Sequence, residues 1–258
     1  MADRTERRTS RHASPGASGP GFSWNDFLRH QRLLVISPHA DDETAGAGGL
    51  IARIKKAGGA AFVLVLSVGD LLHFDNSGKK VEGRTRAQEL ADAMRVLRVD
   101  DFEIVYEDND MHLRMDTLPR RDLVNIIERK ARLAAEKIHP TMIVLPAPSF
   151  NQDHEAIYKA GLTACRPHLA SMKSFQNMVL IADAPQLAWG EYKFRPNFYV
   201  DISDVLDVKL KAFRCHRSQM RPGPHMGGEE ALHRLAEWRG KEISVPAAEA
   251  FECFRFVV

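Results

Sequence analysis

Two clusters of polar residues in this chain combine side-chain types that bind metal ions, and each follows a short apolar run. The first cluster places the imidazole of His39 beside the carboxylates of Asp41 and Asp42. The second contains Asn151 and, a few positions later, the imidazole of His154. Two imidazoles and one carboxylate are the three protein ligands typical of a catalytic zinc ion, which keeps a further position for water. If the clusters meet in the folded chain, they can form a hydrolytic metal site.

Each cluster also has a structural interpretation. Aspartates suit the first turn of a helix, where a carboxylate accepts hydrogen bonds from free N–H groups and faces the positive end of the helix dipole. Capping requires only one aspartate, however, and does not require His39. His154 by itself could be a solvated residue at a helix start, so its interpretation as a ligand depends on pairing with the first cluster.

Short β-branched runs alternate with longer amphipathic stretches along the chain. The runs predict strands at Leu33–Ile36, Phe62–Val68, Phe102–Tyr106, Met142–Leu145, Met178–Ala182 and Phe198–Ile202. The amphipathic stretches predict helices at Ala45–Lys56, Arg84–Leu97, Arg120–Ile138, Val205–His216 and Glu230–Arg239. This βαβ repetition predicts an α/β fold, a Rossmann-like doubly wound and mostly parallel sheet with helices on both faces. Such sheets bind ligands beyond the carboxyl ends of their strands, where both polar clusters lie.

The composition narrows the class of protein. A single domain over residues 21–258 is expected, and residues 1–20, rich in Arg, Ser, Gly and Pro, are predicted to be a disordered tail. That tail carries the whole net charge of +2, so the neutral remainder offers no electrostatic footprint for nucleic acid. No segment approaches the roughly 20 continuous apolar residues of a membrane span. The three dispersed cysteines fit a reducing cytoplasm, where we expect the protein to be located.

The first cluster is Pro38-His39-Ala40-Asp41-Asp42-Glu43, and the second contains Asp153-His154. Together they resemble the signature of the PIG-L/LmbE-type N-acetylglucosaminyl deacetylases, which implies an LmbE-like fold. The resemblance covers most of the chain from about Arg32 onward. Weaker family-like segments occur in order at Arg86-Ala87-Gln88-Glu89, Asp108, His216-Arg217-Ser218-Gln219 and Ala248-Glu249-Ala250-Phe251.

The resemblance implies roles for individual residues. It makes His39, Asp42 and His154 the zinc ligands and Asp41 the general base. Zinc would polarise the amide carbonyl and lower the pKa of its bound water towards 7, so that Asp41 could accept a proton from that water. Fe²⁺ is an alternative to Zn²⁺, because a set of imidazoles and a carboxylate binds either ion.

The resemblance also makes Arg86 and Asp108 contacts to sugar hydroxyls. Each has a structural alternative. Arg86 could be a solvated helix residue paired with Glu82 or Glu89. Asp108 could serve the turn formed by Asp108-Asn109-Asp110.

The sequence departs from the family pattern at Asn151, where a histidine usually stands and is thought to stabilise the oxyanion. An Asn amide can still donate a hydrogen bond to a tetrahedral intermediate, but it cannot supply a proton. The proton donor to the leaving amine is therefore open between Asp41, His216 and His225. His216 could instead be a structural histidine at a helix end. His225 lies in a Gly/Pro-rich stretch that is expected to form a loop over the site, as a substrate contact or as an ordinary surface residue.

The leading hypothesis is thus a zinc-dependent hydrolase that removes an N-acetyl group from a glucosamine-like sugar or glycoconjugate. One alternative keeps the metal site and makes the enzyme an amidase on a thiol conjugate or an antibiotic-like glycoside. An alternative of another class is a catalytically weak sugar- or nucleotide-binding module, whose site lost activity through the change at Asn151. The expected partner is a small N-acetylated sugar or glycoconjugate, and homo-oligomerisation is left open.

Overall fold

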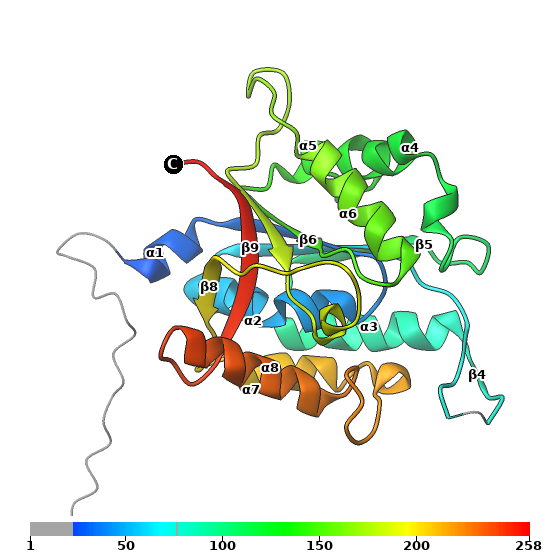
Figure 1. Ribbon diagram of the computed structural model, residues 1–258. Coiled ribbons are helices and arrows are strands. Elements are labelled where there is room, and N and C mark those ends of the chain that lie inside the picture. The colour runs from blue at the N-terminus through cyan, green and yellow to red at the C-terminus, as the bar shows by residue number, and fades with distance from the viewer. Residues whose placement is uncertain (1–22, 76) are drawn as a thin grey trace, which may run out of the picture.

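The structure, a computed structural model, describes residues 23–75 and 77–258 of the chain. Its centre is a seven-stranded sheet in the order β5-β2-β1-β6-β7-β9-β8 (Figure 1). These strands are β1 (Arg32–Ser37), β2 (Ala60–Ser67), β5 (Asp101–Tyr106), β6 (Met142–Pro146), β7 (Met178–Ala182), β8 (Phe198–Asp201) and β9 (Ala248–Phe256). In this sheet β9 runs antiparallel to β7 and β8, and the other neighbouring strands are parallel. The prediction of a doubly wound, mostly parallel sheet is confirmed, whereas the predicted tail of residues 1–20 lies outside the described residues.

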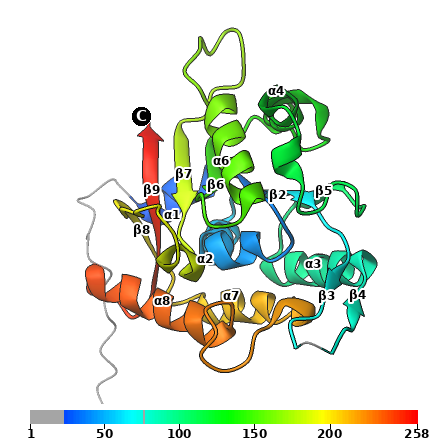
Figure 2. The ribbon, with the colours of Figure 1, turned by 45° about the vertical axis from the view of Figure 1, so that its right-hand side comes forward.

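Helices cover both faces of the sheet (Figures 1 and 2). One face carries α2 (Asp42–Ala57), α3 (Gly83–Leu97), α7 (Leu206–Phe213) and α8 (Glu229–Glu242), with α1 (Trp24–Arg29) against α2. The other face carries α4 (Arg120–Asn125), α5 (Ala135–Ile138) and α6 (Gln152–Ala164). A small hairpin, β3 (Leu71–Leu72) with β4 (Lys80–Val81), precedes α3. Among the described residues, no helix combines the length and apolar character that crossing a bilayer requires.

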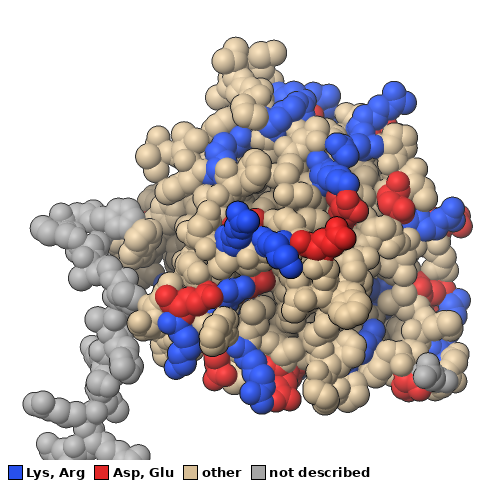
Figure 3. All heavy atoms as spheres, viewed as in Figure 1, with Lys and Arg blue, Asp and Glu red and all other residues tan. Residues whose placement is uncertain are grey.

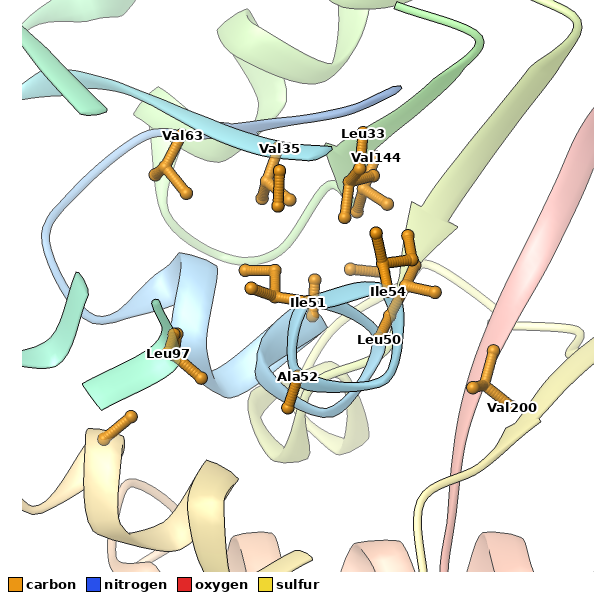
Figure 4. Packing of buried hydrophobic residues seen from close by; sticks show 14 of the residues in the cluster. Leu33, Val35, Leu50, Ile51, Ala52, Ile54, Val63, Leu97, Val144 and Val200 are labelled. Atoms are coloured by element: carbon orange, nitrogen blue, oxygen red, sulfur yellow. The ribbon is translucent and has the colours of Figure 1, made fainter. Parts of the chain in front are cut away.

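Each central strand sends alternate side chains into two separate cores, because successive residues of a strand point to opposite faces. Leu33 and Val35 of β1 pack against α2, and Leu34 and Ile36 pack into the core under α4 and α6. Figure 4 shows Ile51 of α2 directed towards Val35 and its neighbours in the sheet. Burial on both faces explains why these strands are continuous apolar runs in the sequence.

The predicted helix over Arg120–Ile138 is wrong as one element. The structure instead has α4, a π-helical turn at Ile126–Lys130, an interruption and then α5. At the interruption, the carboxylate of Glu103 accepts hydrogen bonds from the backbone N–H groups of Arg132 (2.9 Å) and Leu133 (2.6 Å). These bonds replace the intrahelical bonds that a continuous helix would have supplied there.

The sheet also contains a strand that the sequence pattern does not single out, β9 near the C-terminus. It inserts between β7 and β8 and is antiparallel to both. Acidic and basic side chains are interspersed over most of the face seen in Figure 3, in keeping with the small net charge.

Candidate active site

The two polar clusters lie side by side because β1 and β6 are adjacent parallel strands of the sheet. His39 follows β1, Asp42 begins α2, and His154 lies in the first turn of α6. The carboxylate Oδ2 of Asp42 is 3.5 Å from Nδ1 of His39 and 3.2 Å from Nε2 of His154. One carboxylate oxygen therefore faces both imidazoles.

These three side chains could hold a metal ion, since one ligand atom from each lies within 4.8 Å of the others. Tetrahedral zinc with bonds of about 2.0–2.2 Å separates its ligand atoms by about 3.3–3.6 Å. The 3.5 and 3.2 Å separations measured from Asp42 agree with that geometry. The donor set of two imidazoles and one carboxylate therefore fits a divalent ion such as zinc.

Asp153 orients one of the candidate ligands. Its Oδ2 is 2.9 Å from Nε2 of His39, and its Oδ1 accepts a hydrogen bond from the backbone N–H of Met115 at 2.9 Å. This leaves Nδ1 of His39 to face Asp42, in the arrangement of carboxylate, histidine and metal that fixes a ligating imidazole. Burial opposes charge on His39, but the hydrogen bonds with Asp153 and Asp42 prevail and raise its pKa to about 9. A site that favours a proton here also favours a metal cation.

Asp153 belongs to the second motif, but the sequence pattern assigns no role to it. The signal that could have identified a role for it was its position immediately before His154, a candidate metal ligand. The residue that it contacts, His39, is 114 positions away in the chain, so only the fold could identify it.

The two adjacent aspartates have opposite electrostatic environments. Burial would raise the pKa of Asp42, but the facing His154 and His39 outweigh it and hold that pKa well below the usual range. Burial and the charge of Asp42 raise the pKa of Asp41 to about 7, although His216 and Arg86 act in the opposite direction. A carboxylate with a pKa near neutrality is suited to take up and return a proton.

Asp41 occupies a strained backbone position at the N-cap of α2, with φ 119° and ψ −30°. Its side chain makes no capping hydrogen bond, so capping does not account for it. The backbone N–H of Asp41 donates to Oε2 of Glu43 at 3.0 Å, and its C=O accepts from Ala45 N–H at 2.9 Å. Such outliers persist where surrounding contacts hold them, often at functional sites.

Glu43 is in turn held by His216 from the C-terminal part of the chain. Nε2 of His216 lies 3.0 Å from Oε1 of Glu43, and the hydroxyl of Thr44 donates to the same oxygen at 2.6 Å. Both members of the pair are buried, with side-chain exposures of 1 % and 0 %. Burial disfavours charge on His216, but Glu43 outweighs it and raises the pKa of His216. His216 therefore contacts Glu43 instead of lining the cavity described next.

A cavity of about 560 Å³ opens over the candidate metal ligands. Its lining includes Asp41, Arg86, Asn151 and His225, together with apolar side chains such as Phe150 and Phe213. His225 belongs to the Gly/Pro-rich segment of residues 220–228, which does border the site, and its Nδ1 accepts a hydrogen bond from Gly227 N–H at 2.9 Å.

Asp108 lies outside this cavity. Its exposed carboxylate accepts a hydrogen bond from the backbone N–H of Met111 at 2.8 Å, which is the turn role considered for it. It lines a neighbouring depression of about 420 Å³ that is separate from the candidate metal ligands. The structure therefore places Asp108 in a different depression from the cavity that Arg86, the other residue expected to contact a sugar, lines.

Arg86 is buried, with 2 % exposure, and does not form the surface ion pair considered for it. Its Nη1 donates to the carbonyl of Gly69 at 3.0 Å and to Nε2 of His112 at 2.7 Å. A side chain at Gly69 would collide with His112, because a Cβ there would lie 2.5 Å from that residue's Cβ. Burial and the charge of Arg86 lower the pKa of His112 to about 3 and keep it neutral. Sequence reasoning missed His112, although it follows the strand β5 at the same sheet edge.

Asn151 caps the helix that carries His154. Its Oδ1 accepts a hydrogen bond from the backbone N–H of Asp153 at 2.9 Å, as a helix N-cap does. The same residue lines the cavity, and capping uses only the oxygen of its amide. The –NH₂ group of Asn151 is consequently free of this role and can serve as a donor.

Comparison with known proteins shows which family and which relatives this chain resembles. The family model described as PIG-L, GlcNAc-PI de-N-acetylase, matches residues 34–165. The chain is 29 % identical over 221 residues to diacetylchitobiose deacetylase of Thermococcus kodakarensis, covering 82 % of this chain and 78 % of that protein. It is 27 % identical over 228 residues to the probable N-acetyl-alpha-D-glucosaminyl L-malate deacetylase 2 of Bacillus subtilis, covering 83 % and 96 %.

The fold also matches a solved structure. N,N'-diacetylchitobiose deacetylase from Pyrococcus horikoshii superposes with a TM-score of 0.66, covering 90 % of this chain and 86 % of that chain at 22 % identity. At this level of identity the likeness establishes the shared architecture.

Proposed function

This chain belongs to the PIG-L family, whose model matches half of it, and from that premise we propose that it is a metal-dependent deacetylase of N-acetylated amino sugars. The substrate is a glucosamine-like sugar, free or in a glycoconjugate, as the names of the relatives suggest for those proteins. One observation carries the proposal. Asp41, whose side chain makes no capping hydrogen bond, lies beside a three-residue metal-binding set in one cavity.

His39, Asp42 and His154 would hold the metal, which is zinc by the chemistry of its donors, with Fe²⁺ as the alternative. When bound, the ion polarises the acetyl carbonyl and makes water more acidic. Asp41 accepts the proton that the attacking water loses. Asn151 donates a hydrogen bond from its amide to the carbonyl oxygen as that oxygen gains negative charge.

The leaving amine needs a proton, and the geometry favours Asp41 as its source. His216 is buried and engaged with Glu43, so it does not reach the cavity. Asp41 can return to the amine nitrogen the proton taken from water as the C–N bond breaks. The products are acetate and the free amino sugar, and Asp41 is again a carboxylate. His225, at the cavity wall, contacts the sugar.

The test is release of acetate from a panel of N-acetylated amino sugars, with and without a chelator. The proposal predicts release that the chelator abolishes and that added zinc or Fe²⁺ restores. Release of a larger acid from an acylated thiol conjugate or antibiotic-like glycoside, in place of acetate from these sugars, would favour the amidase. Binding of sugar or nucleotide without hydrolysis, in protein that holds no metal, would favour the binding module.

A further inference from the structure

The wall of the cavity contains an arginine that the proposed reaction does not use. Arg221, from the segment of residues 220–228, lines the cavity and is partly buried. Its guanidinium carbon lies 4.1 Å from the centre of the Phe74 ring, so the side chain is held in place by stacking. Within the described part of the chain, its guanidinium forms no hydrogen bond or ion pair, and its Nη1 is buried without a partner.

Arg86 faces the same cavity and also lacks a carboxylate partner among the described residues. The contacts of its Nη1 are with neutral acceptors, the carbonyl of Gly69 and the ring of His112, and its buried Nε has no partner. Burial lowers the pKa of Arg86, and the charge of Arg221 adds to this effect, so the two cations are close enough to repel each other. Burying an unpaired charge is costly, and a ligand that supplies an anion removes that cost.

The carboxylates whose charge acts on the two arginines form no ion pair with either of them. Asp41 and Asp42 attract Arg86, and Asp41 attracts Arg221, but neither aspartate comes within ion-pair distance of them. Asp42 faces two imidazoles, and a divalent cation held there would offset its negative charge. The cavity would then contain two guanidinium groups that have no ion-pair partner among the described residues.

We propose that Arg221, supported by Arg86, forms an anion subsite, and that the preferred substrate is an N-acetylated amino sugar that carries a phosphate or a carboxylate. This inference rests on the deacetylase function proposed above. A guanidinium matches either anion with two parallel hydrogen bonds, and the contact with the Phe74 ring holds the Arg221 guanidinium at the cavity before the substrate arrives.

The test compares kcat/KM for neutral N-acetylglucosamine with that for its 1-phosphate, its 6-phosphate and N-acetylmuramic acid. Wild-type protein should prefer at least one of the three anionic substrates. Arg221→Gln should reduce this preference by roughly tenfold to a hundredfold, the loss expected when one hydrogen-bonded partner of a charged group is removed. Arg221→Lys keeps the positive charge but cannot form two parallel hydrogen bonds to the anion. Its preference for anionic substrates should therefore fall by an intermediate factor. Comparison of the two sugar phosphates with N-acetylmuramic acid shows whether the subsite prefers a phosphate or a carboxylate.

Arg217→Gln is the matched control, because Arg217 is exposed, lies four positions earlier and is not part of the cavity lining. It should keep the wild-type preference. Calorimetric titration with glucosamine 6-phosphate and with glucosamine, on chelator-treated and metal-loaded protein, supplies a readout independent of turnover. Equal kcat/KM for neutral and all anionic substrates, or an unchanged preference in Arg221→Gln, would overturn the subsite. Failure to deacetylate any member of the wider panel of N-acetylated amino sugars and glycoconjugates would instead refute the proposed function, and the titration would still decide on the subsite.

Discussion

Replacing His216 by alanine leaves the carboxylate of Glu43 buried without its charged partner. In the structure, the two side chains meet at 3.0 Å and are almost fully enclosed. Glu43 keeps the hydrogen bonds from the hydroxyl of Thr44 and the backbone N–H of Asp41. The perturbation therefore removes one charge of a buried pair while most of its surroundings stay in place.

Breaking a buried ion pair by removing one partner costs about 3–5 kcal/mol. The two remaining hydrogen bonds of Glu43 place this case near the lower end of that range, at about 3 kcal/mol. In a chain of this size, 1 kcal/mol shifts Tm by about 2–4 °C, so we expect a fall of about 6–12 °C. Turnover should fall as well, because Glu43 holds the strained backbone of Asp41.

The loss of stability in His216→Ala should depend on pH in a defined direction. Because Glu43 raises the pKa of His216, the stabilisation by the protonated imidazole is fully present below the unfolded value of about 6.5. It is lost as the pH rises through the raised pKa of the folded protein. The difference in Tm between the wild type and His216→Ala should therefore be larger at pH 6 than at pH 9.

Thermal unfolding followed by circular dichroism measures the effect, with metal content determined on the same samples. His216→Gln, which retains a hydrogen-bond donor, should lose less stability than His216→Ala. The control is His233→Ala, which truncates a partly exposed histidine on α8 and should change Tm little. If His216→Ala unfolded at the wild-type temperature, or no lower than His233→Ala, the buried pair would not support the loop that carries Asp41.

Three further predictions concern the reaction and its metal. Asp153→Asn should lower metal affinity by roughly 10- to 100-fold, as measured by competition with a chelator, because it removes the negative charge that orients His39. Asp41→Asn should retain the metal but lose roughly 10²- to 10⁴-fold in kcat, and an unchanged kcat would remove Asp41 from the mechanism. Asn151→Ala should lower kcat by roughly 10- to 1000-fold. Asn151→Asp keeps the oxygen that caps α6 but loses the amide donor. If its kcat is as low as that of Asn151→Ala while its Tm is higher, the loss of activity comes from the missing amide donor.

The sequence by itself determined the sheet and the position of the site. Apolar runs such as Leu33–Ile36 are long enough to be strands and apolar on both faces, which predicts a sheet covered by helices on each side. Polar residues that directly follow such runs must lie at one edge of a parallel sheet, so His39 and Asp42 could be assigned to that edge. These inferences succeed because they depend on periodicity and on the order of residues along the chain.

Local periodicity was insufficient wherever a distant side chain satisfied the backbone. The stretch of residues 120–138 has helical spacing, yet Glu103 accepts the N–H groups of Arg132 and Leu133 and permits the break. No residue within that stretch indicates that Glu103 is the acceptor of these N–H groups. In the same way, β9 becomes a strand because β7 and β8 offer it hydrogen bonds on both edges.

The partners of the site residues were decided by tertiary structure alone. His216 meets Glu43 across 173 positions of sequence, and Glu43 in turn accepts a hydrogen bond from the backbone N–H of Asp41. Asp108 matched the family pattern, but it faces outward from its own turn. Residue type and spacing state which chemistry a side chain can perform. Which group it contacts depends on the packing of segments that the sequence separates, and this packing places His216 against Glu43 and leaves Arg221 without a partner.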